Sequence, residues 1–308
     1  MRVIMTGGSG LIGRNLAIDL VKDGHEVIVL SRNPERQRGK LPPEVRLERW
    51  DGRSAEGWGH LVEQAGAILN LAGENLGERR WSEARKRVII ESRVRAGQAV
   101  TKAIAQAVAR AGRKPDVLIQ SSGVGYYGFH ADEIITEESP AAQDFMSHIC
   151  QQWEPPTAPV EEMGVRRVVV RNGVVLSQED GVLPRMLMPF YFFVGGPLGN
   201  GQQWISWIHM KDEIAALRFL IANPQASGVY NLTSPYPVKN ADFERAIGRA
   251  MRRPALIPTP AFAIRLLFGE MAVTVLEGQR AVPERLEKAG FVFKYPRIKE
   301  ALRDLLAK

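Results

Sequence analysis

The sequence has few of the residues that form crosslinks or bind metals. Cys150 is the single cysteine among 308 residues, so neither a disulfide within the chain nor a cysteine-based zinc site can form. The five histidines are scattered without the spacing of metal ligands, and we expect no metal. Such cysteine usage suits a reducing compartment, and we expect a cytoplasmic protein.

Long apolar runs are also missing. The longest stretches, residues 186–194 and 261–276, are short or are interrupted by proline and charged residues. A spanning helix needs about 20 consecutive apolar residues, so we expect no membrane partner. We expect no leader either, because a strand is already predicted from residue 2.

Positive charge is in excess, with 41 lysines and arginines against 34 aspartates and glutamates. This charge is spread through mixed-sign stretches such as 83–95 and 297–308, rather than forming a basic run with interleaved aromatics. We therefore expect no nucleic-acid partner. The densest basic group offers contacts to a cofactor phosphate or forms a solvated face, and it comprises Arg32, Arg36, Arg38 and Lys40.

Strand and helix patterns alternate along the chain, which predicts a parallel sheet covered by helices. The predicted strands are residues 2–6, 27–30, 45–50, 67–71, 117–119, 167–170 and 229–232. The predicted helices include 11–21, 82–110 and 212–221. Regularity fails over 181–201, where glycine, proline, methionine and aromatics indicate a loop-rich segment over a site.

This pattern predicts an α/β fold with two domains. The first is a doubly wound, parallel-sheet Rossmann domain over 1–176, which also receives about 205–232. The second is a smaller, mainly helical substrate domain over 177–204 and 233–308. The aromatics expected to line its pocket, or to pack its core, are Tyr191, Phe192, Phe193, Trp204 and Trp207.

A glycine-rich turn carries the clearest functional signal. The predicted strand 2–6 runs directly into Gly7-Gly-Ser-Gly10-Leu-Ile-Gly13, which fits both G-x-G-x-x-G and G-x-x-G-x-x-G. Between a strand and a helix, such a turn brings backbone N–H groups to a pyrophosphate at the helix N-terminus. We expect the cofactor to contact Thr6, Gly7, Gly8, Ser9, Gly10, Leu11, Ile12 and Gly13.

The end of the second strand indicates which nicotinamide nucleotide fits. NAD-specific sites usually place an acidic residue there for the ribose hydroxyls, whereas this chain has Ser31 and Arg32. A guanidinium can bind a 2′-phosphate with two hydrogen bonds, so the sequence favours NADP over NAD. Arg14 is a second candidate for that phosphate; alternatively, both arginines face solvent.

Several motifs together resemble the extended short-chain dehydrogenase/reductase family, more narrowly its uncharacterised NAD(P)-dependent epimerase-like branch. They are Asn70-Leu-Ala-Gly73, Ser121-Ser-Gly-Val-Gly-Tyr-Tyr-Gly128, Arg171-Asn-Gly-Val-Val-Leu176, Trp207-Ile-His-Met-Lys-Asp212, and a C-terminal run from Phe268-Gly-Glu270 to Ala289-Gly-Phe291. The resemblance spans nearly the whole chain. We also place Leu71, Ala72, Gly73 and Arg93 in the cofactor site.

The chain departs from this family at its proton relay. Family enzymes commonly use a tyrosine four residues before a lysine, and the expected position reads Cys150-Gln-Gln-Trp-Glu154. A carboxylate disfavours a neighbouring thiolate, whereas a lysine favours an ionised tyrosine, so this pair cannot run the usual relay. Prolines 155, 156 and 159 follow, and we expect them to break or restart the helix.

Other residues are candidates for the chemistry. By the resemblance, Ser122 aligns with the active-site serine that hydrogen-bonds a substrate oxygen. Tyr126 and Tyr127 are alternative proton donors or packed aromatics. Glu154 is a desolvated general acid, a helix-surface charge, or a partner for one of two arginines, Arg87 and Arg93.

Two functions follow from these observations. The first is an NADP-dependent oxidoreductase or epimerase-type enzyme that acts on a small molecule with an atypical proton donor. The second is an NADP(H)-binding sensor or regulatory protein with reduced catalysis. By analogy with the family, the helix over 82–110 and the one before Met163 are candidate elements of a homodimer interface.

Overall fold

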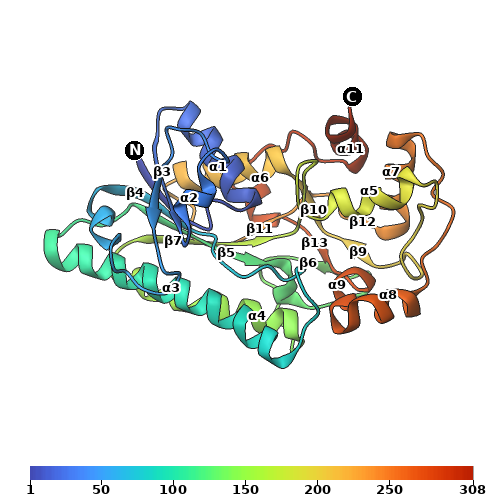
Figure 1. Cartoon of the computed structure of the whole chain (residues 1–308), viewed down its shortest axis with the longest axis horizontal. Coiled ribbons are helices and arrows are strands. Elements are labelled where there is room, and N and C mark those ends of the chain that lie inside the picture. Colours follow the sequence, from blue (N-terminus) through green and yellow to red (C-terminus); the bar gives the residue numbers. More distant parts are fainter. Residues whose placement is uncertain (308) are drawn as a thin grey trace.

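A seven-stranded parallel sheet forms the centre of the molecule (Figure 1). The computed structural model describes residues 1–307; residue 308, the last of the predicted smaller domain, lies outside them. The strand order is β11 (Gly228–Leu232), β7 (Arg166–Asn172), β5 (Val117–Gly123), β4 (Ala65–Asn70), β1 (Arg2–Thr6), β2 (Glu26–Ser31) and β3 (Arg46–Arg49). Each predicted strand is thus confirmed, and the order reverses between β1 and β4.

Helices cover both faces of the sheet, as a doubly wound fold requires. Figure 1 shows α1 (Leu11–Lys22) and α6 (Met210–Ala222) on one face, and α3 (Glu83–Ala111) and α4 (Phe145–Trp153) on the other. Alternate residues of β1 divide between the two cores. Val3 and Met5 join the α1 and α6 cluster, and Ile4 joins the α3 cluster.

The ends of α3 follow from local chemistry. Ser82 Oγ accepts a hydrogen bond from Arg85 N at 3.2 Å, which satisfies one of the free donors at the helix start. Gly112 ends the helix with φ of 60°, a conformation that glycine adopts without steric cost. The helix predicted over 82–110 is therefore confirmed.

The proline-rich segment after α4 restarts the chain as a 3-10 helix, η3 (Pro155–Val160). Pro155 has no N–H to continue the α-helical bonding, and α4 ends at Trp153. Glu154 joins the two elements with helical dihedrals, φ −74° and ψ −45°. The predicted break is confirmed, and it leaves Glu154 one turn beyond Cys150.

A smaller, mainly helical module covers one end of the sheet. Its core joins α5 (Leu183–Tyr191), α7 (Asn240–Met251) and α11 (Ile298–Leu306) through buried residues including Phe190, Phe243 and Leu302. The other short elements of the chain are α2 (Pro34–Gln37), α8 (Ala261–Phe268), α9 (Val273–Leu276), α10 (Glu284–Lys288), η1 (Gly59–Gln64), η2 (Val124–Tyr127) and η4 (Gly269–Ala272).

Three short strand pairs join the smaller module to the loops around the sheet. They are β8 (Val174–Leu176) with β10 (Trp207–His209), β9 (Trp204–Ile205) with β12 (Val238–Lys239), and β6 (Ile134–Ile135) with β13 (Arg280–Ala281). Of all helices within residues 1–307, none is both long and apolar enough to cross a membrane.

The loop-rich reading of 181–201 is wrong in part, because α5 lies inside this segment. Leu183, Leu187 and Phe190 recur at helical spacing and are all buried, which holds the helix against the smaller core. The two prolines of α5 obscured that period: Pro184 lies in the first turn, where it is tolerated, and Pro189 lies near the end.

The buried carboxyl of Glu213 on α6 should make the stability of the folded protein depend on pH. It is fully buried, neither carboxylate oxygen has a hydrogen-bond partner within residues 1–307, and burial raises its pKa to about 8. Between the ordinary pKa and about 8, the native state holds a proton that the unfolded state releases, so stability falls as pH rises.

We expect the urea midpoint to fall between pH 5 and pH 8, and to fall less in Glu213→Gln. Chemical denaturation followed by circular dichroism measures both slopes. Glu287→Gln, at an exposed glutamate, is the matched control and should keep the wild-type slope. Identical slopes for the wild type and Glu213→Gln would contradict the assignment.

Candidate functional site

The glycine turn lies where the strand order reverses, between β1 and β4. Gly7 has φ of 65°, and a Cβ there would lie 2.7 Å from the Leu71 carbonyl carbon. A Cβ on Gly13 would lie 2.5 Å from Gly8 Cα. A Cβ on Gly10 would meet only Gly7 O, at 3.3 Å. Gly7 and Gly13 are thus required by packing, whereas Gly10 faces open space at the N-terminus of α1.

A cavity of about 930 Å³ extends from this turn to the end of β2. It brings together eight of the predicted cofactor residues: Gly7, Ser9, Gly10, Ser31, Arg32, Leu71, Ala72 and Gly73. Thr6 lies beneath it, where its Oγ1 donates to Asn70 Oδ1 at 2.7 Å and accepts from Ala72 N at 3.3 Å. Thr6 therefore fixes the loop after β4 against the glycine turn.

The other predicted members of this turn have different surroundings. Gly8 lies against Val29, and a Cβ there would be 2.6 Å from that side chain. Leu11 packs on the sheet core, and Ile12 lines a neighbouring cavity. Gly8, Leu11 and Gly13 therefore shape the turn from beneath the 930 Å³ cavity.

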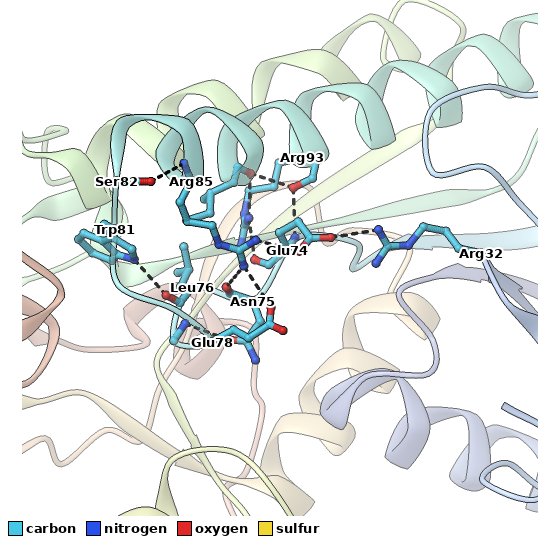
Figure 2. Close-up of polar contacts among 12 residues, drawn as sticks. Arg32, Glu74, Asn75, Leu76, Glu78, Trp81, Ser82, Arg85 and Arg93 are labelled. Atoms are coloured by element: carbon cyan, nitrogen blue, oxygen red, sulfur yellow. Dashed lines mark hydrogen bonds and ion pairs between the residues drawn. The ribbon is translucent and has the colours of Figure 1, made fainter. Parts of the chain in front are cut away.

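Arg32 is an exposed part of the candidate phosphate site, with 74% of its side chain accessible. Figure 2 shows Glu74 between two arginines: its Oε1 lies 3.0 Å from Arg32 Nη1 and its Oε2 lies 3.2 Å from Arg85 Nη1. Burial alone would raise the pKa of Glu74, but the hydrogen bonds and charges of both arginines bring it below its ordinary value. Glu74 thereby holds Arg32 at the cavity edge.

The surrounding basic residues divide into two groups. The first shares the cavity with Arg32 and consists of Arg36, Lys40, Arg53 and Arg95. In the second, Arg38 pairs with Glu35 at 3.0 Å, and Arg14 pairs with Glu179 at 3.3 Å. Arg14, unlike Arg32, does not line this cavity, so its contact with the same phosphate stays a prediction.

A second cavity, of about 540 Å³, begins at Leu71, which it shares with the first. Its lining includes Ile12, Arg93, Ser122 and Cys150. The two cavities together extend across the carboxyl ends of β2, β1, β4 and β5, the edge at which open α/β sheets bind their ligands.

A hydrogen-bonded group of side chains adjoins this second cavity. Ser122 Oγ donates to Glu154 Oε1 at 2.6 Å. Arg171 grips the same carboxylate with two bonds, from Nε to Oε1 at 2.9 Å and from Nη2 to Oε2 at 3.0 Å. This corrects the predicted partners of Glu154, because Arg171 and not Arg87 or Arg93 neutralises it. Ser122 connects the cavity to the buried ion pair.

The two tyrosine candidates lie behind this group and outside the cavity lining. Tyr127 is fully buried; its hydroxyl donates to Asn231 Oδ1 at 2.7 Å and accepts from Arg171 Nη1 at 3.1 Å. Burial raises its pKa to about 12, although Arg171 opposes this. Tyr126 stacks on the same guanidinium, whose central carbon lies 3.3 Å from the ring centroid. We therefore correct the proton-donor reading for both phenols, which hold Arg171 in place.

Cys150 remains a thiol in this environment. Burial, together with the negative charge of Glu154, raises its pKa to about 11. Its Sγ lies 3.4 Å from Gly123 O, a carbonyl at the end of β5. The electrostatic argument made from the sequence thus agrees with the geometry: the pair at the tyrosine and lysine positions does not generate a thiolate.

Arg93 lies in the wall between the two cavities. It is 5% exposed, donates from Nη1 to Glu74 O at 3.1 Å and to Ile89 O at 3.0 Å, and stacks on Trp153 at 4.5 Å. Burial lowers its pKa to about 10. Its Nε is buried and has no hydrogen-bond partner among the described residues, which keeps Arg93 a candidate for cofactor contact.

Comparison with known proteins identifies the family of this chain. Residues 3–233 match the model of the NAD dependent epimerase/dehydratase family. The chain belongs to this family. Residues 259–305, which include α8 to α11, match a C-terminal domain of unknown function, DUF1731. The resemblance seen in the sequence is thereby confirmed.

Three relatives show how far the likeness extends. An epimerase family protein of Mycobacterium leprae is 41% identical over 97% of this chain and 94% of its own length. Human epimerase family protein SDR39U1, solved with NADPH, is 34% identical, with a TM-score of 0.88 and 99% of each chain covered. A nucleoside-diphosphate sugar epimerase from Corynebacterium glutamicum is 32% identical, with a TM-score of 0.78, covering 99% of this chain and 58% of its own.

Within this family fold, the aromatics predicted to line a pocket divide into three groups. Trp204 does line the 540 Å³ cavity. Trp207 is fully buried in the core of the smaller module, so its pocket role is wrong. Tyr191, Phe192 and Phe193 are exposed and outside the lining. Tyr191 is the last residue of α5, and Phe192 and Phe193 come directly after it.

Sequence reasoning missed Arg171 as a member of the site, although its motif was recognised. A signal was present: β7 pairs with β5 in parallel, with Arg171 opposite Ser122. A charged residue that follows three buried valines in a central strand needs a buried partner. Glu154 supplies that partner, and Asn231 on β11 completes the set through Tyr127.

Proposed function

We propose that the protein is an NADP(H)-dependent oxidoreductase or epimerase-type enzyme that acts on a small molecule, with Ser122 at the reacting oxygen and Glu154 behind it. The observation that carries this proposal is the 2.6 Å hydrogen bond from Ser122 Oγ to Glu154 Oε1 at the edge of the 540 Å³ cavity. A family relative solved with NADPH supports the choice of cofactor.

The residues present fit NADP(H). Gly10 leaves space at an uncapped helix start, where backbone N–H groups and the helix dipole favour a pyrophosphate. Arg32 lies at the end of β2, where an NAD-specific site places a carboxylate. The cofactor supplies hydride chemistry when bound; the residues of this chain orient the substrate and handle the proton.

Ser122 and Glu154 have complementary roles in that chemistry. As Ser122 donates to Glu154, its Oγ lone pairs remain available to a substrate hydroxyl, and Glu154 accepts the proton that Ser122 gives up. In the reverse direction the proton returns through Ser122 to the substrate oxygen. Arg171 acts as a positioning residue, because two parallel bonds fix the plane of the carboxylate.

A sensor without turnover is the second candidate, and one observation favours it. The usual tyrosine and lysine positions hold Cys150 and Glu154, and both nearby phenols lie outside the cavity. Absorbance at 340 nm separates the two functions. An enzyme oxidises bound NADPH in a substrate-dependent way, whereas a sensor changes shape or partners on binding NADPH without consuming it.

The cofactor preference is a separate prediction. We expect NADPH to bind more tightly than NADH, and Arg32→Ala to weaken NADPH binding by about tenfold while leaving NADH binding unchanged. Ser31→Asp should shift the preference toward NADH, because its carboxylate accepts from ribose hydroxyls and repels the 2′-phosphate. Fluorescence titration measures each dissociation constant.

Arg38→Ala is the matched control, since Arg38 is equally exposed but pairs with Glu35 outside this cavity. It should leave both affinities unchanged. Equal affinities of the wild type for NADPH and NADH, or an unaltered preference in Arg32→Ala, would refute the role of Arg32.

A further inference from the structure

The cavity beside Ser122 has mainly apolar walls. Its 540 Å³ lies within the range of small-molecule sites. Large side chains from three helices, a strand and the loop before α3 line it. Among them are Trp81, Met146, Trp153, Met186, Trp204 and Met271. Tryptophan and methionine offer extensive apolar contact, and methionine adapts to irregular ligand shapes.

The charged residues in this lining, within residues 1–307, are Arg93 and Glu277. Arg93 donates from Nη1 to two backbone carbonyls and stacks on Trp153, and its buried Nε is the donor that we keep for the cofactor. Glu277 is exposed and borders both this cavity and an adjoining one of about 660 Å³. A diphosphate needs cations or aligned N–H donors, whereas Glu277 presents a negative charge at the shared edge.

The adjoining cavity contains two cations, Lys239 and Arg265. Lys239 Nζ lies 3.1 Å from Asp132 Oδ1 and stacks over Trp204 at 5.5 Å, so its charge is already paired. With Asp132 and Glu277 facing the same space, the two positive charges are balanced by two negative ones. A dianionic ligand would therefore gain little electrostatic attraction there.

Gln203 offers a ligand one polar group, a hydrogen-bond acceptor. Its Nε2 donates to Leu198 O at 3.1 Å and to Val275 O at 2.9 Å, which fixes the orientation of the amide. Its Oε1 is buried and accepts no hydrogen bond within the described residues. A buried acceptor without a donor is costly, and a ligand hydroxyl would satisfy it, whereas phosphate oxygens would repel it.

We propose that this cavity takes a neutral, mainly apolar ketone or secondary alcohol, rather than a nucleoside diphosphate sugar. The inference rests on the proposed function and names its substrate class. In the reduction, bound NADPH would supply a hydride to the carbonyl carbon, and a proton taken from solvent by Glu154 would pass through Ser122 to the oxygen, giving the alcohol and NADP⁺. Oxidation of the alcohol is the reverse.

Binding to the NADPH complex tests this substrate class independently of turnover. The neutral probes are 4-phenyl-2-butanone, 2-decanone and 2-cyclohexenone, and the charged probe is UDP-glucose. Quenching of tryptophan fluorescence is a suitable readout, because Trp81, Trp153 and Trp204 line the cavity. We expect at least one ketone to bind about tenfold more tightly than UDP-glucose. Failure of all three ketones, or tighter binding of UDP-glucose, overturns the proposal.

Two methionines on α5 provide a matched pair of variants. Met186 lines the cavity, whereas Met188 on the same helix is 54% exposed. We expect Met186→Lys to weaken ketone binding at least tenfold and Met188→Lys to leave it unchanged. Met271→Lys repeats the test from another wall, in case Met186→Lys does not fold. Unchanged ketone binding in a folded cavity variant counts against the proposal.

Turnover separates this inference from the function on which it rests. A ketone that binds but leaves NADPH unoxidised supports the substrate class and contradicts the enzyme assignment. Oxidation or epimerisation of UDP-glucose supports the enzyme assignment and overturns the substrate class.

Discussion

Gly10→Val is expected to weaken NADPH binding by about a hundredfold or more while the protein stays folded. A Cβ at Gly10 meets only Gly7 O at 3.3 Å, so the protein itself accommodates the first added atom. The remaining side chain would occupy the space at the start of α1 where we place the pyrophosphate. Two lost hydrogen bonds to a charged group correspond to about 3 kcal/mol.

The neighbouring glycines distinguish this effect from unfolding. Gly13→Val should destabilise the fold itself, because its Cβ would lie 2.5 Å from Gly8 Cα, a backbone atom that cannot move aside. Gly10→Ala should bind NADPH with an intermediate affinity. Titration gives the dissociation constants, and thermal unfolding followed by circular dichroism reports the fold. Near-native binding in a folded Gly10→Val would place the cofactor elsewhere.

The sheet was predictable because its signals are local. Most of the seven strands contain a short apolar run, although β3 reads Arg-Leu-Glu-Arg, and the glycine turn requires a strand before it and a helix after it. The end of β2 likewise fixed where Arg32 lies. Elements that depend on distant packing were harder to predict: α5 was hidden by its prolines, and the paired short strands were missed because two or three residues carry no readable period.

The residues around Glu154 were predictable only in part, because their contacts depend on how distant strands pair. The four-residue spacing of Cys150 and Glu154 was readable from the chain. The effect of the following prolines on Glu154 was not: this residue keeps helical dihedrals just before the break. Which charge neutralises Glu154 depends on register between strands that are remote in sequence. Arg171 reaches it because β7 lies beside β5. The valines before Arg171 indicate that it needs a partner, but no local pattern identifies Glu154 as that partner.

The same pairing of β5 with β7 also changes the role that we assign to Tyr126 and Tyr127. Their position after β5 made them reasonable donors, yet the site buries one phenol and stacks the other on Arg171. A tyrosine with a pKa near 12 gives up its proton less readily than an ordinary one. In the proposed function, an ion pair reached through a serine takes the place of the usual relay, and aromatic side chains hold its cation.

That arrangement predicts a large effect at Ser122. Once a substrate is found, Ser122→Ala should slow the chemical step by on the order of tenfold to a thousandfold, because it removes the hydroxyl that contacts the reacting oxygen. Glu154→Gln should also slow it: an amide still accepts from Ser122 but does not take up its proton. Single-turnover oxidation of bound NADPH at 340 nm measures the step directly.

Cys150→Ser is the matched control, since it changes one atom next to the same serine. Cys150 is a buried thiol whose pKa of about 11 keeps it protonated at neutral pH, so the variant should retain most of the activity. Arg171→Lys tests positioning: lysine keeps the charge but gives up the paired, planar grip on the carboxylate, so we expect a lower kcat with unchanged NADPH affinity. A large loss of rate in Cys150→Ser, with fold and NADPH binding intact, would instead assign the proton transfer to the thiol. If the serine and glutamate variants both kept full activity, the proton would have to travel by a route that avoids the Ser122–Glu154 hydrogen bond altogether.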